Sequence, residues 1–132
     1  MEPRKISAGI VVNNGKILLI KRKFEPYKNF WAPPGGFTDK GISESVENCC
    51  IREIEEETGI KVEIIKKIDA VKKYNKLKNR EEEIHFFLVK QLSDKMIFND
   101  EVLDVRWFNK KDFNSIKLIP HFKKLIGKYK IL

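Results

Sequence analysis

The 132-residue sequence predicts a single domain of the α/β class, on three observations. Two strand-like runs at 6–12 and 16–22 are joined by a turn sequence, a capped helix is expected at about 46–58, and apolar residues recur at helical spacing over about 119–129. A chain of this length can bury a core, and its 42% hydrophobic and 35% charged residues are ordinary for a globular domain. We therefore expect one domain over residues 1–132.

The first two runs predict a β-hairpin. Residues 6–12 (ISAGIVV) and 16–22 (KILLIKR) flank Asn13-Asn14-Gly15, and an Asn-Gly pair between apolar runs favours the tight turns that join antiparallel strands. The next segment, 24–36 (FEPYKNFWAPPGG), predicts a loop rich in aromatic residues, proline and glycine. We expect Trp31 of this loop to pack in the core and Gly35-Gly36 to let the backbone turn sharply.

Residues 46–58 predict the central helix. Ser45 is a favourable N-cap residue, and Gly59 suits the position that follows the last turn. At about 100° per residue, one side of this helix is apolar near its start and is expected to be buried. The apolar residues of that side are Val46, Cys49, Cys50 and Ile54.

The same side of the helix ends in carboxylates. Glu53 and Glu57 point almost as Val46 does, and Glu56 lies in line with Cys49. Carboxylates that share a partly desolvated site repel one another, and a hard divalent cation such as Mg²⁺ or Mn²⁺ relieves that repulsion. Arg52, one turn before Glu56, can brace such a cluster. The alternative is a charged surface helix with ordinary ion pairs one turn apart.

The second half of the chain predicts further strands and a last helix. We expect one or two strands over 60–73, a polar mobile loop at 74–82, a strand at 83–90, a loop at 93–101, a strand at 102–108, a turn at 109–112 and a helix at about 119–129. His85, beside two phenylalanines in the strand at 83–90, is expected to be packed or hydrogen-bonded rather than catalytic.

Composition limits the cellular setting and the partners. No apolar run has the length of a membrane span, and the N-terminus MEPRKIS lacks the apolar core of a secretory signal. The adjacent Cys49 and Cys50 are expected to be buried free thiols, which predicts a reducing, cytoplasmic setting. The net charge of +8 would suit a polyanion such as a nucleotide or RNA, but the scattered lysines favour general surface charge over nucleic-acid binding.

Two sequence motifs resemble those of the Nudix hydrolases. Residues 52–60 (REIEEETGI) are similar to the core of the Nudix box, R-E-apolar-x-E-E-x-G-apolar, and Glu44 stands eight residues before Arg52, as that pattern asks. Upstream, 31–36 (WAPPGG) resembles the W-x-x-P-G-G segment that leads into the box. One feature departs from the pattern: seven residues rather than five separate Gly36 from Glu44, which indicates a two-residue insertion, Ile42-Ser43.

The resemblance implies an α/β/α sandwich and a MutT-like, metal-dependent pyrophosphohydrolase. It places the metal, Mg²⁺ with Mn²⁺ as a possible substitute, on Glu53, Glu56, Glu57 and Gly36, with Arg52 as a further catalytic residue. A divalent cation there would grip the substrate diphosphate and activate water.

The resemblance leaves the proton acceptor open between two glutamates. Glu53 belongs to the box, and Glu101 stands six residues before Trp107, a spacing at which MutT-like enzymes place a glutamate across from the box helix. Asp100 and Asp104 are close rivals of Glu101.

The implied substrate is a nucleoside diphosphate linked to another moiety. Arg22, at the end of the second run, is a candidate phosphate contact, and Phe24 or Tyr27 could face the base. The short chain and the Glu101–Trp107 spacing favour an ordinary or oxidised nucleoside triphosphate. The alternatives are ADP-ribose or another nucleotide sugar, and a dinucleoside polyphosphate, for which Tyr74 is an inexact match.

A different class of function is a degenerate Nudix domain that only binds a nucleotide or RNA. Such domains usually have damaged box glutamates, whereas all are present here. We therefore expect an enzyme with a nucleotide substrate and no membrane partner, acting as a monomer or homodimer.

Overall fold

Seven strands in one mixed sheet form the centre of the molecule. A computed structural model describes residues 2–97 and 100–131. Within these ranges the strands are β1 (Arg4–Asn13), β2 (Lys16–Arg22), β3 (Trp31–Ala32), β4 (Gly35–Phe37), β5 (Val62–Asn75), β6 (Arg80–Gln91) and β7 (Val102–Asn109). Their order is β3-β2-β1-β6-β5, with β4 paired to β1 and β7 paired to β2.

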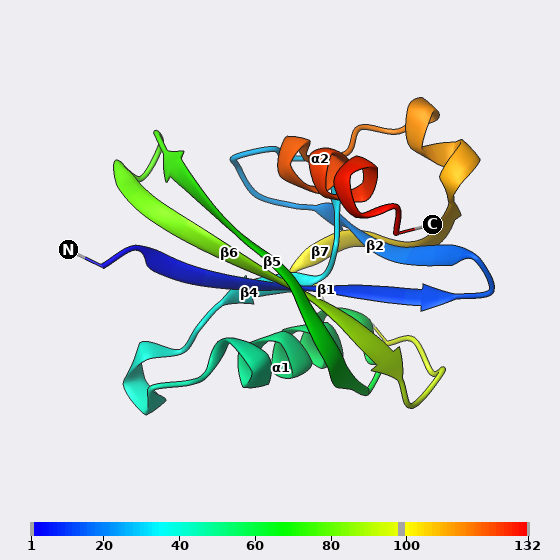
Figure 1. Cartoon of the computed structure of the whole chain (residues 1–132), viewed down its shortest axis with the longest axis horizontal. Coiled ribbons are helices and arrows are strands. Elements are labelled where there is room, and N and C mark those ends of the chain that lie inside the picture. The colour runs from blue at the N-terminus through cyan, green and yellow to red at the C-terminus, as the bar shows by residue number, and fades with distance from the viewer. Residues whose placement is uncertain (1, 98–99, 132) are drawn as a thin grey trace.

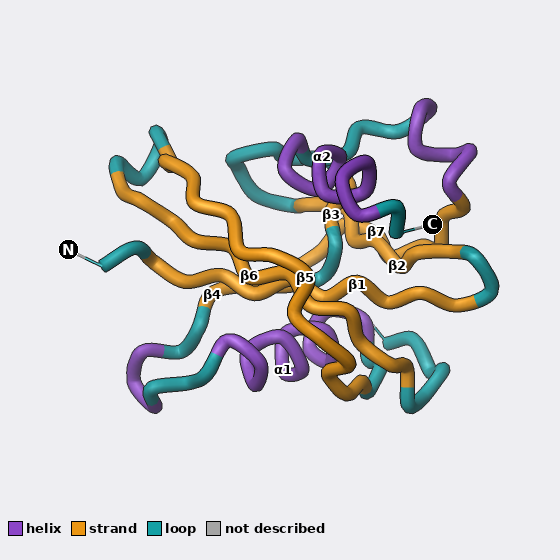
Figure 2. Tube along the Cα trace, in the orientation of Figure 1, coloured by secondary structure: helices purple, strands orange, loops and turns teal. Residues whose placement is uncertain are grey.

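Helices cover both faces of this sheet (Figure 1). The helix α1 (Val46–Thr58) lies on one face and α2 (Pro120–Tyr129) on the other, with short 3₁₀ turns at Lys40–Ile42 and Lys110–Ser115 (Figure 2). Each face has its own apolar core. The core beside α2 includes Ile10, Phe86 and Phe122, and the core beside α1 includes Val11, Ile54 and Phe87. The predicted α/β class and the α/β/α sandwich are both confirmed.

The predicted hairpin is formed by β1 and β2. Val12 pairs with Ile17 and Asn13 with Lys16, so Asn14 and Gly15 form the turn. Both turn residues have positive φ, 51° and 73°, which is the backbone that matches the twist of the two strands.

Strand β1 lies between β4, which carries the glycine pair, and β6. Its first half is antiparallel to β4, with Ser7 opposite Gly36 and Ala8 opposite Gly35, and it is parallel to β6, with Ser7 also opposite His85. Residues far apart in the sequence therefore meet on adjacent strands. This arrangement positions the site described below.

The predicted helix is also confirmed. The Ser45 side chain accepts a hydrogen bond of 3.1 Å from the backbone N–H of Asn48, and Gly59 has a φ of 80°. Cys49, Cys50 and Ile54 are buried, and Val46 packs against the same core. Both cysteines are free, as expected, and burial raises the pKa of the Cys49 thiol to about 11 and that of Cys50 to about 12.

Two predictions about loops were correct only in part. The polar segment 74–82 is a hairpin end rather than a mobile loop, because β5 continues to Asn75 and β6 begins at Arg80. Opposite charges across the strands, such as Lys73 opposite Glu82, support these polar strands. The segment 24–36 contains β3 and ends in the first residues of β4, and these strands of two or three residues form because β2 and β1 supply their partners. The expected loop at 93–101 lies partly outside the described residues.

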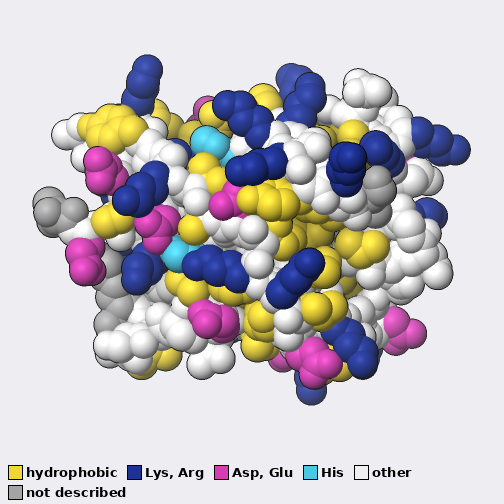
Figure 3. Space-filling model, viewed as in Figure 1, with side chains coloured by type: hydrophobic (Ala, Val, Ile, Leu, Met, Phe, Trp, Pro, Cys, Tyr) yellow, Lys and Arg dark blue, Asp and Glu magenta, His cyan; other side chains and the backbone are white. Residues whose placement is uncertain are grey.

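The basic side chains do not gather into one patch on the face that Figure 3 shows, where they are scattered among acidic and apolar groups. This agrees with general surface charge. In the described part of the chain, no helix combines the length and the apolar character that crossing a membrane requires.

Candidate active site

A cleft of about 300 Å³ opens on the α2 face of the sheet. Its apolar floor comes from β1 and β6, including Ala8, Ile84 and Phe86. The loop after β2 forms one wall, the β5–β6 hairpin forms another, and the start of α2 closes one side with Ile119 and His121. The last turn of α1 reaches this cleft through Glu57, so the acidic helix and the cleft form one continuous site.

Glu57 is a buried carboxylate at the base of the cleft, with 8% of the residue exposed. Its Oε1 accepts a hydrogen bond of 2.7 Å from the backbone N–H of Gly35. Its pKa is raised to about 8, mainly by burial; the N–H of Gly35 and the charge of Arg22 oppose this rise, and the negative charges of Glu53 and Glu101 add to it. The Glu57 carboxylate therefore lies in surroundings where its ionised form would be stabilised by a nearby cation.

Arg22 is the basic residue that faces this carboxyl. It lines the cleft, and its Nε donates to the carbonyl oxygen of Pro26 at 2.9 Å, which fixes the guanidinium. Burial lowers its pKa, while the charges of Glu57, Glu25 and Glu82 raise it. A partly desolvated guanidinium with free donor positions is well suited to a phosphate group. The structure therefore places this predicted contact inside the cleft.

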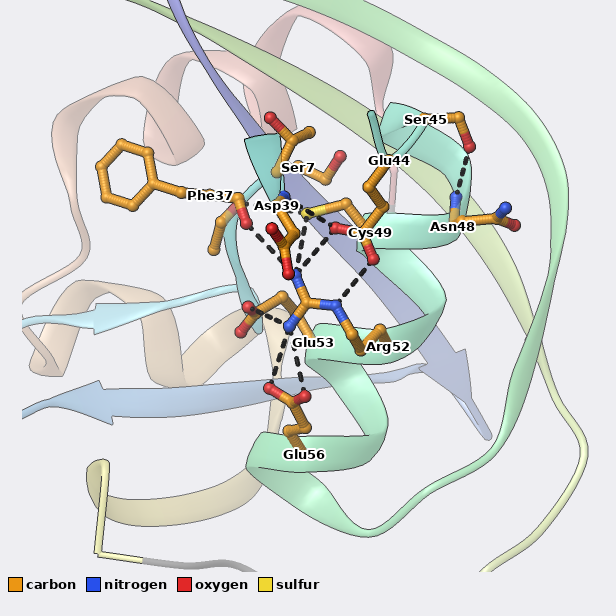
Figure 4. A network of polar contacts seen from close by, with 12 residues as sticks. Ser7, Phe37, Asp39, Glu44, Ser45, Asn48, Cys49, Arg52, Glu53 and Glu56 are labelled. Atoms are coloured by element: carbon orange, nitrogen blue, oxygen red, sulfur yellow. Dashed lines mark hydrogen bonds and ion pairs between the residues drawn. The ribbon is translucent and has the colours of Figure 1, made fainter. Parts of the chain in front are cut away.

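Arg52 organises the outer part of the acidic helix (Figure 4). Its Nε and Nη2 donate to the two carboxylate oxygens of Glu44 at 2.7 and 2.8 Å, and its Nη1 donates to Glu53 at 2.9 Å and to Glu56 at 3.1 and 3.2 Å. The hydrogen bonds from Arg52 lower the pKa of Glu44 to about 2. This network confirms that Arg52 braces the acidic residues, and it extends the bracing to Glu44.

Glu53 lies between the buried and the exposed acidic residues. Burial is the main reason that its pKa is raised, and the charges of Glu56 and Glu101 add to the effect. A Cβ on Gly36 would stand only 2.5 Å from the Glu53 Cδ, so a glycine is needed for this carboxylate to lie against β4. The Gly36 carbonyl oxygen accepts a hydrogen bond of 3.4 Å from Cys49 Sγ.

Glu101 lies close enough to the helix for its charge to act on both Glu53 and Glu57. Asp100 and Asp104, the two alternatives to Glu101, have other hydrogen-bond partners. Asp104 accepts from Arg106 Nε at 2.7 Å and from the backbone N–H of Val105, and the backbone of Asp100 accepts from Lys23 Nζ. The charge of Glu101 thus reaches the box helix, so Glu101 stays a candidate for the acidic residue opposite it.

The predicted substrate contacts divide into two groups. Phe24 and Tyr27 line the cleft, and Tyr27 also packs at 5.3 Å against Phe30. Tyr74 is not part of the cleft lining; it lies in an adjoining depression, where its hydroxyl donates to Asn79. The sequence did not single out several polar residues that line the cleft, among them Lys73, Arg80, Glu82 and His121. The first three stand in the segment interpreted as a strand end and a mobile loop, and the alternation of basic and acidic residues there was the available signal.

The acidic residues suit a divalent cation by their chemistry. All donors are oxygens, and the charges of Glu53, Glu57 and Glu101 act on one another, so a hard cation would relieve their repulsion. As the side chains stand, no three acidic, histidine or cysteine groups within the described ranges are arranged to hold a metal ion. Glu56 instead accepts hydrogen bonds from Arg52, and 45% of its side chain is exposed.

Comparison with known proteins agrees with this fold. The family described as the NUDIX domain matches residues 3–129. A putative 8-oxo-dGTP diphosphatase of Bacillus subtilis is 33% identical over 122 residues, covering 92% of this chain and 76% of that protein. An ADP-ribose pyrophosphatase of Methanocaldococcus jannaschii is 48% identical over 60 residues, which are 46% of this chain but only 34% of that protein.

Solved structures give the same result. The crystal structure of a MutT NUDIX hydrolase from Burkholderia pseudomallei has a TM-score of 0.85 and 28% sequence identity, and the match covers 98% of this chain and 99% of that one. The sandwich and its acidic helix thus define a MutT-like protein of the pyrophosphatase type. The chain belongs to the Nudix hydrolase family. Members of this family generally use divalent metal ions, commonly Mg²⁺.

Proposed function

We propose that this protein hydrolyses a phosphoric anhydride bond of a nucleoside triphosphate, ordinary or oxidised, and releases the nucleoside monophosphate and pyrophosphate. The observation that carries this proposal is the position of Glu57 and Arg22 at one end of an apolar cleft. A carboxylate that needs a cation and a guanidinium suited to phosphate frame a diphosphate there, and the apolar floor is suited to a nucleoside.

We assign the metal to Glu53, Glu56 and Glu57, with Gly36 as a backbone contact. A bound Mg²⁺ would neutralise the diphosphate and make water a better nucleophile. Arg52 would hold Glu53 and Glu56 in position through the hydrogen bonds of 2.9 to 3.2 Å that it donates to them. Arg22 would bind the phosphate oxygens and balance the charge that grows on them during attack.

Water would attack phosphorus, the bridging oxygen would leave with one product, and the water proton would pass to a carboxylate. Glu101 suits this role if Glu53 is a metal ligand, because a carboxylate bound to a cation is a poor proton acceptor. Phe24 and Tyr27 at the rim of the cleft would contact the base. Tyr74, outside the cleft lining, is not needed for this arrangement.

The long match to a putative 8-oxo-dGTP diphosphatase supports a nucleoside triphosphate as the substrate. The match to an ADP-ribose pyrophosphatase supports the second candidate, a nucleotide sugar, but it covers less than half of this chain. The two candidates share the diphosphate end of the site and differ in what lies beyond it.

A hydrolysis screen tests the proposal. Ordinary and oxidised nucleoside triphosphates, ADP-ribose, a nucleotide sugar and a dinucleoside polyphosphate are each incubated with Mg²⁺, and the products are identified. We expect a nucleoside monophosphate and pyrophosphate from a triphosphate, and no activity in the presence of a chelator. Release of phosphate alone, preference for ADP-ribose, or binding without hydrolysis of any compound would contradict the proposal.

A further inference from the structure

The β5–β6 hairpin supplies hydrogen-bond donors to one wall of the cleft. Glu82 lines the cleft but is only 1% exposed, and its Oε2 accepts from Arg80 Nε at 3.0 Å and from Asn75 Nδ2 at 3.2 Å. Lys73 Nζ stands 3.5 Å from the Glu82 Oε1, and the Asn75 Oδ1 accepts from the backbone N–H of Lys78. The two acceptor groups of this wall, a carboxylate and an amide oxygen, therefore already have partners within the protein.

Arg80 keeps one edge of its guanidinium for a ligand. Its Nε is used for Glu82, and within residues 2–97 and 100–131 its two terminal nitrogens have no hydrogen-bond partner. The guanidinium carbon lies 4.9 Å from the centre of the Phe37 ring, and both residues line the cleft. A guanidinium donates through its terminal nitrogens in a fixed planar fork. Held by Glu82 and by the ring, this fork is an ordered pair of donors.

This fork lies close to the diphosphate end of the cleft. Phe37, which contacts the Arg80 guanidinium, is the last residue of β4, the strand that carries the glycine pair. Arg22 has both Glu57 and Glu82 among its charged neighbours, so one guanidinium lies within charge range of both acids. In a nucleoside 5′-phosphate only the ribose separates the phosphate from the base. A base joined to a diphosphate at Glu57 would therefore stand beside the Arg80 fork.

A pair of donors discriminates among the bases by their hydrogen-bonding edges. Guanine presents two adjacent acceptors, O6 and N7, and an arginine fork binds both at once. Adenine presents N7 beside an amino group, which is a donor, cytosine presents an amino group, and thymine presents a single acceptor beside its methyl group. Oxidation of guanine at C8 turns N7 into an N–H donor, so the acceptor pair is lost. Hypoxanthine keeps O6 and N7, and the fork therefore matches unoxidised 6-oxopurines.

We propose that Arg80, held by Glu82 and Phe37, is a specificity-determining residue that binds O6 and N7 of an unoxidised 6-oxopurine, guanine or hypoxanthine. This inference rests on the proposed function for the position of the diphosphate, at Glu57. It deepens that function by naming ordinary guanine and hypoxanthine nucleotides as the preferred substrate class, ahead of the oxidised nucleotide and of adenine nucleotides.

Changes of single atoms in the base test this contact. With Mg²⁺ present, dGTP, dITP, 7-deaza-dGTP, 8-oxo-dGTP and dATP are compared as substrates by kcat/KM, and the corresponding monophosphates, which have no anhydride bond, by calorimetric Kd. The 7-deaza compound replaces N7 by C–H and keeps O6. We expect this change to weaken binding and to lower kcat/KM about tenfold, as loss of a hydrogen bond to a charged group does. The hypoxanthine compound should resemble the guanine compound, and the 8-oxo and adenine compounds should be at least as weak as the 7-deaza compound.

Substitution of Arg80 locates the effect. Arg80→Gln removes the fork, whereas Arg80→Lys keeps a positive charge beside Glu82 without the planar pair of donors. In a double-mutant cycle of residue and base, the preference for dGTP over 7-deaza-dGTP should disappear in Arg80→Gln and shrink in Arg80→Lys. Arg4→Lys is the matched control, because the Arg4 guanidinium carbon also lies 4.9 Å from the centre of the Phe37 ring but Arg4 does not line the cleft. Its base preference should equal that of the wild type.

Equal use of dGTP and 7-deaza-dGTP by the wild type would overturn the assignment, and this comparison needs no variant. A preference for 8-oxo-dGTP, a dGTP preference that survives in Arg80→Gln, or an equal loss of preference in Arg4→Lys would also overturn it. Failure of the proposed function looks different. No hydrolysis of any triphosphate, together with tighter binding of dGMP than of 7-deaza-dGMP, would refute the enzyme and leave the base contact standing.

Discussion

The ion pair between Glu44 and Arg52 should make a measurable contribution to stability at neutral pH. Both Glu44 oxygens accept from Arg52, at 2.7 and 2.8 Å, and the Glu44 side chain is only 5% exposed. Its pKa falls from 4.5 to about 2. Such a difference corresponds to about 3 kcal/mol, and because Arg52 is one-third exposed we reduce the expected effect of Glu44→Gln to about 1–2 kcal/mol.

The effect should depend on pH in a defined direction. A carboxyl whose pKa is lower in the folded state stabilises the fold above its unfolded pKa, and this stabilisation is lost as the pH falls through the folded value. The difference between wild type and Glu44→Gln should therefore be full at pH 7 and should shrink between about pH 4.5 and pH 2. In melting temperature, the difference at pH 7 amounts to about 4–7 °C for a domain of this size.

Urea unfolding at several pH values measures this difference, and Glu55→Gln serves as the control. Glu55 is an exposed residue of the same helix and has no ion pair within the described residues. The reasoning is refuted if Glu44→Gln is as stable as Glu55→Gln at pH 7, or if its deficit is the same at pH 3 as at pH 7. Either result would mean that the paired geometry does not stabilise the ionised carboxyl.

Three further predictions concern the acidic helix, the glycine pair and Glu101. Glu57→Gln should abolish turnover but make the metal-free protein more stable at pH 9. The pKa of Glu57 is raised to about 8 in the folded protein, so its ionisation costs stability progressively between about pH 4.5 and 8. Steady-state kinetics test the first part, and melting in the presence of a chelator tests the second. Gly36→Ala should displace the Glu53 side chain, which lowers activity but leaves the melting temperature nearly unchanged. Gly35→Ala should destabilise the fold, because its Cβ would meet the Ser7 backbone oxygen. Equal melting temperatures for the two variants would contradict this. Glu101→Gln should lower kcat strongly with little change in metal affinity, and near wild-type kcat alongside an inactive Glu53→Gln would assign proton transfer to Glu53 instead.

Local features of the sequence predicted the regular elements well. The hairpin turn, the helix at 46–58 and both of its ends follow from residue types at fixed offsets, namely Asn14-Gly15, Ser45 and Gly59. These signals depend only on residues that are close in the sequence, so they can be recognised without knowledge of the fold. The box motif also identified the acidic residues before their surroundings were known.

Strand boundaries outside such signals were less predictable. The polar hairpin end at 74–82 was interpreted as a loop, because its strands are held by cross-strand charge pairs rather than by an apolar alternation. The strands β3 and β4 are too short to show any period, and they exist only because β2 and β1 present unpaired backbone edges to them.

The sequence by itself determined the family motif, the central helix and the set of carboxylates that the helix presents. It did not distinguish their environments. The packing of β4 against β1 buries Glu57 beneath the N–H of Gly35, while Glu56 stays in solvent. The sheet brings Arg22, Glu57 and Glu82 to one cleft. The physical reason is that helical periodicity fixes the direction of a side chain, whereas its burial, and hence its pKa and its partners, depends on strands that lie far away in the sequence.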